Sequence, residues 1–412
     1  MIVATRLAAV DAQNFWMSAR TAGDQFLLYT FDGAPAVEPA LAALRRRASV
    51  CHDLRLRVLD TSPVRYPQWV YGAVTPEQFV VHGGVDWTTC LGAVTRLAGR
   101  SLDATSAAWR LHVFTPVAGV PTSSGPSTVV VLHISHALAD GTRAAELAGW
   151  LFGRAAAVRP VPPTRRGSLV VRSLIAARGH RRLVRDTEAG LVVAAPSPRP
   201  LLLTNSAPDG ARRGRIVIRH RSALGAPTVT VATLAAVGTA LAGYLGERGQ
   251  DVSQLAAEVP MSYSGIREAH NFFRNVGVGL YPGRSDQVDL IAADLAAARA
   301  RGNHPSSRAE RQAFAALPAP LLRWGVGRFD PAVRPPAVTG HTVVTSVNRG
   351  DADLQFGAAP VLFTGGLPTL SPMMSLVHGV HGIGDAVAVS VHAADSAGDI
   401  GEYVDRLEHA LG

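Results

Sequence analysis

The chain has 412 residues, 47% of them hydrophobic and 17% charged, and this length suits two globular domains of about 200 residues each. The formal net charge is +9 and all 40 basic residues are arginine, in a chain rich in alanine and glycine, so we attribute the charge to compositional bias. The basic runs carry no interleaved aromatic residues and no zinc-finger, RNP or helix-turn-helix pattern, which argues against a nucleic-acid partner.

The cysteines and the apolar segments bear on the compartment. Cys51 and Cys90 are too few and too far apart for a zinc site or a disulfide framework, which favours a reducing environment. Residues 1–16 are interrupted by Asp11 and lack a sustained apolar core and a cleavage motif, so we expect no signal peptide. The uncharged stretch 222–246 is diluted by threonine and glycine and predicts a buried helix rather than a membrane span. We expect a cytoplasmic protein.

The first part of the chain, residues 1–155, alternates between helical and strand patterns and predicts a mixed α/β subdomain. Helices are expected at 7–15, 37–47, 87–97 and 141–152, and strands at 25–31, 54–58, 69–74, 109–114 and 128–134. Asp140 is well placed to cap the helix that starts at Gly141.

Residues 156–213 are rich in proline and arginine and predict a linker with one helix near 169–185. A second α/β subdomain is expected over 214–412. Its predicted strands are 215–220, 257–261, 276–281, 341–347 and 386–392, and its helices 230–245, 288–301 and 400–411. The densest arginine groups, 178–185 and 212–221, are consistent with a solvated linker or with an acidic partner, either a cofactor phosphate or an anionic membrane surface.

The segment Ser135-His136-Ala-Leu-Ala-Asp140-Gly141 ends the apolar strand 128–134 and is the strongest candidate for chemistry. A histidine titrates near neutral pH and can act as an acid or a base. His136 stands at the strand end, where a side chain can face a cleft, whereas His133 has the opposite parity and is expected in the core. Asp140 could cap the following helix or pair with an arginine from elsewhere, and both interpretations stay open.

This segment resembles the HHxxxDG motif of the CoA-dependent acyltransferase superfamily. Other segments are similar to bacterial wax ester synthase/diacylglycerol acyltransferases, and together they span most of the chain. They are Val10-Asp-Ala-Gln-Asn-Phe-Trp, Ser101 to Phe114 with Trp109-Arg110-Leu-His-Val, Val259-Pro-Met-Ser, and Asn275 to Pro282. The resemblance implies two chloramphenicol-acetyltransferase-like subdomains, each a mixed sheet with helices, with an active-site tunnel at their interface.

The resemblance also implies the roles of individual residues. His136 is the catalytic base, and Asp140, Gly141 and Ser135 orient the catalytic loop, with Asp140 paired to an arginine across the interface. Trp109 and Arg110 are candidates for the site wall and Asn275 for the oxyanion site, where a turn role is equally open for Asn275.

Three departures from the family pattern concern the substrate. Ser135 replaces the first histidine, Ala107-Ala108 replaces Pro-Leu, and Thr230-Val231 replaces an Asn-Asp pair at the start of the long central helix. The last change removes two polar groups and bears on the identity of the acceptor.

Other motifs are weaker. Gly277-Val-Gly279 lacks the third glycine of a dinucleotide-binding turn, and the chain has no Gly-x-Ser-x-Gly nucleophile elbow. His378 to Asp385 contains two histidines, but its glycines predict a hairpin rather than a metal site. We expect no bound metal or cofactor.

The favoured function is transfer of a fatty acyl group from acyl-CoA, the co-substrate, to a lipid hydroxyl such as diacylglycerol or a fatty alcohol, as in triacylglycerol biosynthesis. The alternatives are a natural-product acyltransferase with a carrier-bound donor and a catalytically idle lipid- or acyl-CoA-binding homologue. The expected protein is a monomer or weak dimer, and it could associate peripherally with a membrane or a lipid droplet.

Overall fold

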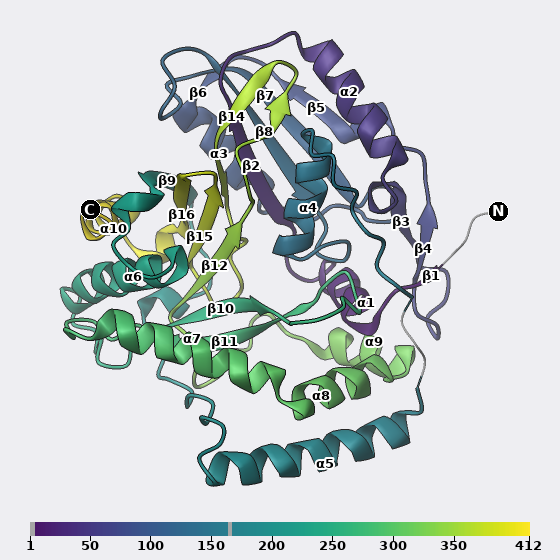
Figure 1. The fold of residues 1–412 in the computed structure, drawn as a ribbon, viewed down its shortest axis with the longest axis vertical. Helices are drawn as coiled ribbons and strands as arrows, with labels where there is room; N and C mark the ends of the chain where they lie inside the picture. Colours follow the sequence, from purple (N-terminus) through teal and green to yellow (C-terminus); the bar gives the residue numbers. More distant parts are fainter. Residues whose placement is uncertain (1–4, 164–166) are drawn as a thin grey trace.

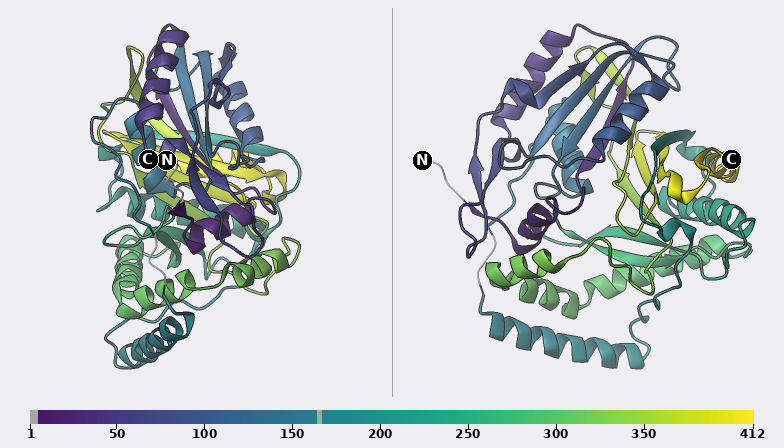
Figure 2. Two further views of the ribbon diagram at one scale, coloured as in Figure 1. Left: turned by 90° about the vertical axis from the view of Figure 1, so that its right-hand side faces the viewer. Right: turned by 180° about the vertical axis from the view of Figure 1, so that it is seen from behind.

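Two large mixed β-sheets form the frame of the protein in a computed structural model (Figure 1). The structure describes residues 5–163 and 167–412. The first four residues of the N-terminal segment and residues 164–166 of the predicted linker therefore lie outside the described residues. The two further views in Figure 2 show the two sheets in separate lobes that meet along the middle of the molecule.

The first sheet has seven strands. Its order is β13-β14-β2-β8-β7-β5, and β6 also pairs with β7. The strands are β2 (Gln25–Phe31), β5 (Phe79–His82), β6 (Val85–Asp86), β7 (Trp109–Ala118), β8 (Ser127–Ile134), β13 (Gln355–Phe356) and β14 (Ala359–Gly366). Side chains of alternate parity on β2 enter two different cores, because successive residues of a strand point to opposite faces. One core includes α2 (Val37–Val50) and α4 (Gly141–Leu151), and the other includes α3 (Trp87–Leu97).

The second sheet has six strands in the order β11-β10-β12-β15-β16-β9. They are β9 (Arg212–His220), β10 (Ala256–Ser262), β11 (Phe273–Gly279), β12 (Thr342–Asn348), β15 (Leu376–Ile383) and β16 (Ala386–Ala394). The core of this lobe holds α6 (Val229–Gly246), α7 (Gln287–Asn303) and α10 (Ile400–Ala410) against the sheet. The hairpin predicted between His378 and Asp385 is the connection of β15 to β16, with Gly384 at φ 53°.

Smaller elements lie where the lobes meet. A three-stranded sheet in the order β1-β4-β3 contains β1 (Thr5–Arg6), β3 (Leu56–Leu59) and β4 (Gln68–Tyr71). Helix α1 (Ala9–Met17) packs against α8 (Pro305–Ala315) and α9 (Ala319–Arg328) from the second part of the chain.

The predicted fold class is confirmed, since both halves form mixed sheets covered by helices. The subdomain boundaries stay a prediction. The first sheet, however, is not made only of residues before 155, because β13 and β14 come from the second part of the chain and β14 pairs with β2. Of the predicted linker, residues 169–188 form helix α5 (Leu169–Glu188) and Arg212 and Arg213 belong to β9.

Helix α6 is long and apolar enough to cross a membrane by length and composition, and it is the one helix of the described residues that is. Ten of its 18 residues are buried, eight of them in the second core, which agrees with the predicted core helix.

Candidate active site

His136 lies directly beyond β8, at the point where the buried strand turns toward α4. All eight residues of β8 are buried, whereas His136 is half-buried. The backbone carbonyl of Ser135 accepts hydrogen bonds from the N–H groups of Leu138 and Ala139, so the chain reverses within four residues. This turn takes the imidazole out of the sheet and toward the second lobe, where its ring lies 5.6 Å from that of Phe273.

The amide of Asn271 holds one edge of His136. Asn271 Oδ1 lies 2.5 Å from His136 Nδ1, and Asn271 Nδ2 donates to the carbonyl of His136 and, at 3.0 Å, to Asp11 Oδ1. Both acceptors of Nδ2 are oxygens, so the amide orientation is fixed and Oδ1 must accept from an N–H. In the neutral imidazole this arrangement places the proton on Nδ1 and leaves the lone pair on Nε2, which bonds to no described residue.

Asp11 fixes the segment that carries Asn271. Its two carboxylate oxygens accept hydrogen bonds from the backbone N–H groups of His270 and Asn271, at 3.0 and 2.9 Å, as well as from the Asn271 amide. The side chain of Asp11 is 1% exposed, so these bonds are shielded from water. Asp11 comes from the first turn of α1, so this helix binds the connection between β10 and β11.

His270 lies between two buried carboxylates. Its Nδ1 is 3.3 Å from Asp11 Oδ2 and its Nε2 is 3.5 Å from Asp53 Oδ2, while Arg143 of α4 pairs with Asp53 at 2.6 Å. Burial alone lowers the pKa of His270, but its interactions with Asp11 and Asp53 outweigh burial and raise the pKa to about 9. Burial raises the pKa of Asp53, but the hydrogen bonds from His270 and His52 and the charges of His270 and Arg143 hold it far below its ordinary range. His270 is therefore cationic at neutral pH.

This cationic histidine gives the protein a pH-dependent stability. The pKa of His270 rises on folding from 6.5 to about 9, so its contribution is complete below pH 6.5 and is lost as the pH rises through 9. We expect the free energy of unfolding, measured by urea titration, to fall by roughly 3 kcal/mol across this window. In His270→Gln this fall should be absent. An equal slope in both proteins would contradict the assignment.

Asp140 joins the two lobes beside His136. It caps α4 by accepting from the N–H of Arg143 at 2.9 Å, and it pairs with Arg267 of the second lobe at 2.7 and 3.2 Å. It also accepts from the N–H of Phe272 at 2.8 Å. Both interpretations of Asp140, cap and ion pair, therefore apply together, and the arginine that the sequence left open is Arg267. Asp140 is 2% exposed, so its carboxylate is shielded from water.

Gly141 allows a close approach between the lobes. A Cβ at this position would lie 3.3 Å from Cγ2 of Val347 and 3.7 Å from Oε1 of Gln25, whose amide also donates to the carbonyl of Ala139. A side chain here would require the Val347 methyl group of β12 to shift by a few tenths of an ångström.

The other predicted site residues lie apart from this network. Trp109 is fully buried and donates to the carbonyl of Leu54 at 2.7 Å, which makes it a core residue. Arg110 pairs in register with His133 and makes no ion pair with a described residue. The amide of Asn275 is exposed and donates to Glu258 on the neighbouring strand, so the structure does not bring it to His136. His133 is buried and bonds to Asp24 at 2.9 Å, as predicted.

Sequence reasoning missed most of the residues that surround His136. Asp11 stands in the N-terminal segment that resembles the family, but its neighbours gave no hint that it contacts residues 270 and 271. Asn271 lies only four residues before Asn275, in a connection without helical or strand periodicity. Arg267 is one of 40 arginines, and the sequence contains nothing that distinguishes it from the others.

A hollow of about 390 Å³ lies in the second lobe, and none of its lining residues belongs to the motif. Val347, which contacts the position of Gly141, forms one wall, and the N-terminus of α6 with Thr228 and Thr230 forms another. Thr230 replaces the asparagine of the family pattern, and its hydroxyl is hydrogen-bonded to that of Ser346 at 2.8 Å. The departure at Thr230 therefore changes the lining of this hollow.

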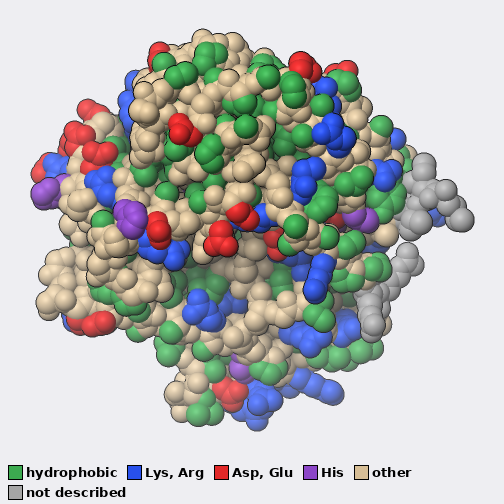
Figure 3. All heavy atoms as spheres, turned by 45° about the horizontal axis from the view of Figure 1, so that its top comes forward, with side chains coloured by type: hydrophobic (Ala, Val, Ile, Leu, Met, Phe, Trp, Pro, Cys, Tyr) green, Lys and Arg blue, Asp and Glu red, His purple; other side chains and the backbone are tan. Residues whose placement is uncertain are grey.

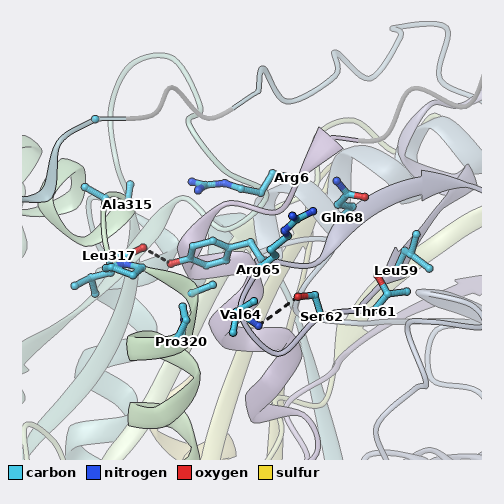
Figure 4. Close-up of a pocket in the computed structure, with 15 residues that line it drawn as sticks. Arg6, Leu59, Thr61, Ser62, Val64, Arg65, Gln68, Ala315, Leu317 and Pro320 are labelled. Carbon is cyan, nitrogen blue, oxygen red and sulfur yellow. Dashed lines mark hydrogen bonds between the residues drawn. The ribbon is translucent and has the colours of Figure 1, made fainter.

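A larger cavity, about 670 Å³, lies between the β3–β4 connection and the turn from α8 to α9 (Figure 4). Tyr66 donates to the carbonyl of Leu317 across it at 2.8 Å, and Arg6, Arg65 and Gln68 line one side. No residue of the motif lines this cavity.

His378 of the β15–β16 hairpin is structural. His378 bonds through Nδ1 to Thr342 and through Nε2 to Tyr403, so both ring nitrogens are occupied within the core. Among residues 5–163 and 167–412 no group of histidine, cysteine and acidic side chains is arranged to hold a metal ion.

Comparison with solved structures shows that the chain shares its fold with two enzymes. The wax ester synthase/diacylglycerol acyltransferase from Marinobacter aquaeolei VT8 matches 99% of this chain and 98% of its own, with a TM-score of 0.64 and 17% identity. A mutant starter condensation domain of rhizomide synthetase in complex with C8-CoA matches 99% and 93%, with a TM-score of 0.60 and 14% identity. A further mutant of that domain, with C8-CoA and Leu-SNAC, has a TM-score of 0.59, 15% identity and the same coverage. No protein-family model and no curated protein matches the chain.

Proposed function

We propose that the protein is an acyltransferase that moves a fatty acyl group from acyl-CoA to a hydroxyl of a lipid acceptor, with His136 as the general base. The observation that carries this proposal is the fixed orientation of Asn271, which holds the proton of His136 on Nδ1 and leaves Nε2 as a base. The fold shared with a wax ester synthase/diacylglycerol acyltransferase and with condensation domains that bind C8-CoA supports the same reaction class.

The proton steps follow from the free Nε2. It takes the proton of the acceptor hydroxyl as that oxygen attacks the thioester carbonyl carbon, and a tetrahedral oxyanion forms. The carbon–sulfur bond then breaks, and the imidazolium gives the proton to the departing CoA thiolate. The products are an ester and free CoA, the enzyme returns to its starting state, and no acyl-enzyme is needed.

Asn271 has a positioning role in this scheme. It accepts from Nδ1–H in both protonation states of the ring, so the base does not rotate during the cycle. Asp11 holds Asn271 through two hydrogen bonds, and the cationic His270 pairs with Asp11.

The test is release of CoA from a panel of acyl-CoAs with diacylglycerol, hexadecanol or a short alcohol as acceptor. Turnover by the wild-type protein, lost in a His136 variant, is the expected result. If the wild-type protein binds acyl-CoA but releases CoA no faster than the His136 variant with every acceptor, the protein is a binding homologue and the proposal is wrong.

Asn271→Leu should lower kcat by 10- to 100-fold, because the ring is then free to adopt the other tautomer. KM for acyl-CoA should stay within about twofold, since Asn271 orients the base and does not hold the donor. Steady-state kinetics with one acyl-CoA checks this, with Asn275→Leu as the matched control, which should be close to wild type. Equal losses in the two variants would argue against a specific role for Asn271.

A second candidate is a natural-product acyltransferase with a carrier-bound donor. The likeness to a starter condensation domain favours it. Parallel assays with an acyl-CoA and the same acyl group on a carrier protein distinguish the two, since the favoured donor will show the higher kcat/KM.

A further inference from the structure

Helix α5 lies along the outer edge of the molecule, against α8, and none of its 20 residues is buried (Figure 1). Its packed side is narrow. A Cβ at Gly179 would lie 3.1 Å from the Cα of Ser306, so the two helices approach closely along this line. The remaining circumference of α5 faces away from the protein.

The first two turns of this outward face are apolar. Val170, Val171, Leu174 and Ile175 are 69%, 53%, 56% and 41% exposed. At 100° per residue these four side chains fall within an arc of about 140°, which does not include Gly179. Exposed apolar residues grouped in this way mark an interaction surface rather than the scattered exposure that is normal on proteins.

The next two turns of the same face are basic. Arg178, Arg181, Arg182 and Arg185 fall within the same arc as the apolar residues, and Arg182 pairs with Asp186 at 3.5 Å. The other three make no hydrogen bond or ion pair with a described residue. Basic side chains gather along the lower edge of the molecule, where α5 lies (Figure 3). The outward face is thus apolar at one end and cationic at the other.

The order of apolar and basic turns along α5 argues against a second copy of the chain as the partner that binds its outward face. In an antiparallel pair of α5 helices the apolar turns of one helix would face the arginines of the other, and in a parallel pair arginine would face arginine. A lipid surface suits both ends, because apolar side chains enter the acyl region while arginines reach the phosphates.

We propose that α5 docks the protein on an anionic lipid surface, with Val170, Val171, Leu174 and Ile175 inserted and Arg178, Arg181 and Arg185 bound to lipid phosphates. This inference does not rest on the proposed reaction. It predicts binding to vesicles by a protein whose His136 has been replaced.

The experiment is flotation of the full chain with vesicles of phosphatidylcholine alone or with phosphatidylglycerol added, at low and high salt. We expect strong binding only to the anionic vesicles, and loss of binding as salt screens the arginines. Changing Arg178, Arg181 and Arg185 together to Gln should weaken binding about 100-fold. Leu174→Ser with Ile175→Ser should weaken it at least 10-fold and leave the melting temperature unchanged, since both side chains are exposed.

A matched control changes three exposed arginines elsewhere, Arg46, Arg299 and Arg334, to Gln and removes the same charge. This control should bind like the wild type. Equal weakening in the two triple variants would show a general charge effect and overturn the proposal, as would absence of wild-type binding at low salt. A dimer in solution that the Leu174 and Ile175 changes dissociate would assign the face to a second copy instead.

Discussion

Changing His136 to Gln should lower kcat for acyl transfer by about 10³-fold, the scale that a positioned general base contributes. Glutamine keeps a polar group of similar reach but cannot take a proton at neutral pH. Binding of acyl-CoA should be unchanged, because Nε2 acts on the acceptor hydroxyl and makes no bond within the described protein. The measurements are single-turnover release of CoA and titration of acyl-CoA binding.

His82 provides the matched control for this change. It is also half-buried and in the first lobe, but it bonds to His112 and has no contact with the Asn271 segment. His82→Gln should keep kcat within about threefold of wild type. Comparable losses in the two variants, or a His136→Gln protein with full activity, would reject His136 as the base.

Removing the Asp140 carboxylate should lower the free energy of unfolding by about 3–5 kcal/mol, the usual cost of breaking a buried ion pair. Asp140→Ala leaves Arg267 without its partner, takes the cap from α4 and frees the N–H of Phe272. Urea titration monitored by fluorescence measures the effect. Activity should also fall, because the same segment carries Asn271.

A variant of Asp86 serves as the control that distinguishes the loss of a helix cap from the loss of an ion pair. It caps α3 through the N–H of Thr89 at 2.8 Å but is exposed and pairs with no arginine, so Asp86→Ala should cost only about 1 kcal/mol. In a double-mutant cycle, Asp140→Ala combined with Arg267→Leu should destabilise less than the sum of the single changes. If Asp140→Ala costs no more than Asp86→Ala, the ion pair with Arg267 contributes little.

Local pattern predicted the elements that carry the motif. The strand at 128–134, the turn and the helix at 141–152 were visible because β8 is a continuous apolar run and Asp140 has the chemistry of a cap. The predicted ranges 25–31 and 87–97 match β2 and α3 residue for residue. In these segments the hydrophobic pattern of the sequence matches the residues that are buried in the structure.

The rest depended on contacts between distant residues. Strand β14 contains Pro360 and two glycines, which weaken any strand pattern, and its partner β2 lies more than 300 residues earlier in the chain. Asn271 reaches His136 only because Asp11, Asp53 and Asp140 in the first lobe bind one connection of the second. Hydrophobic periodicity along the sequence does not predict such contacts between the two lobes.

The pairing of β14 with β2 has a consequence for biosynthesis. Until residue 366 has left the ribosome, β2 has an unpaired edge, although six of its seven residues are buried in the finished protein. A nascent chain that ends before β14 therefore exposes the unpaired hydrogen-bonding edge of β2. The first sheet is complete only when nearly nine-tenths of the polypeptide has been synthesised. The lobe that begins the chain is completed by its end, so its sheet stays half-assembled during most of translation.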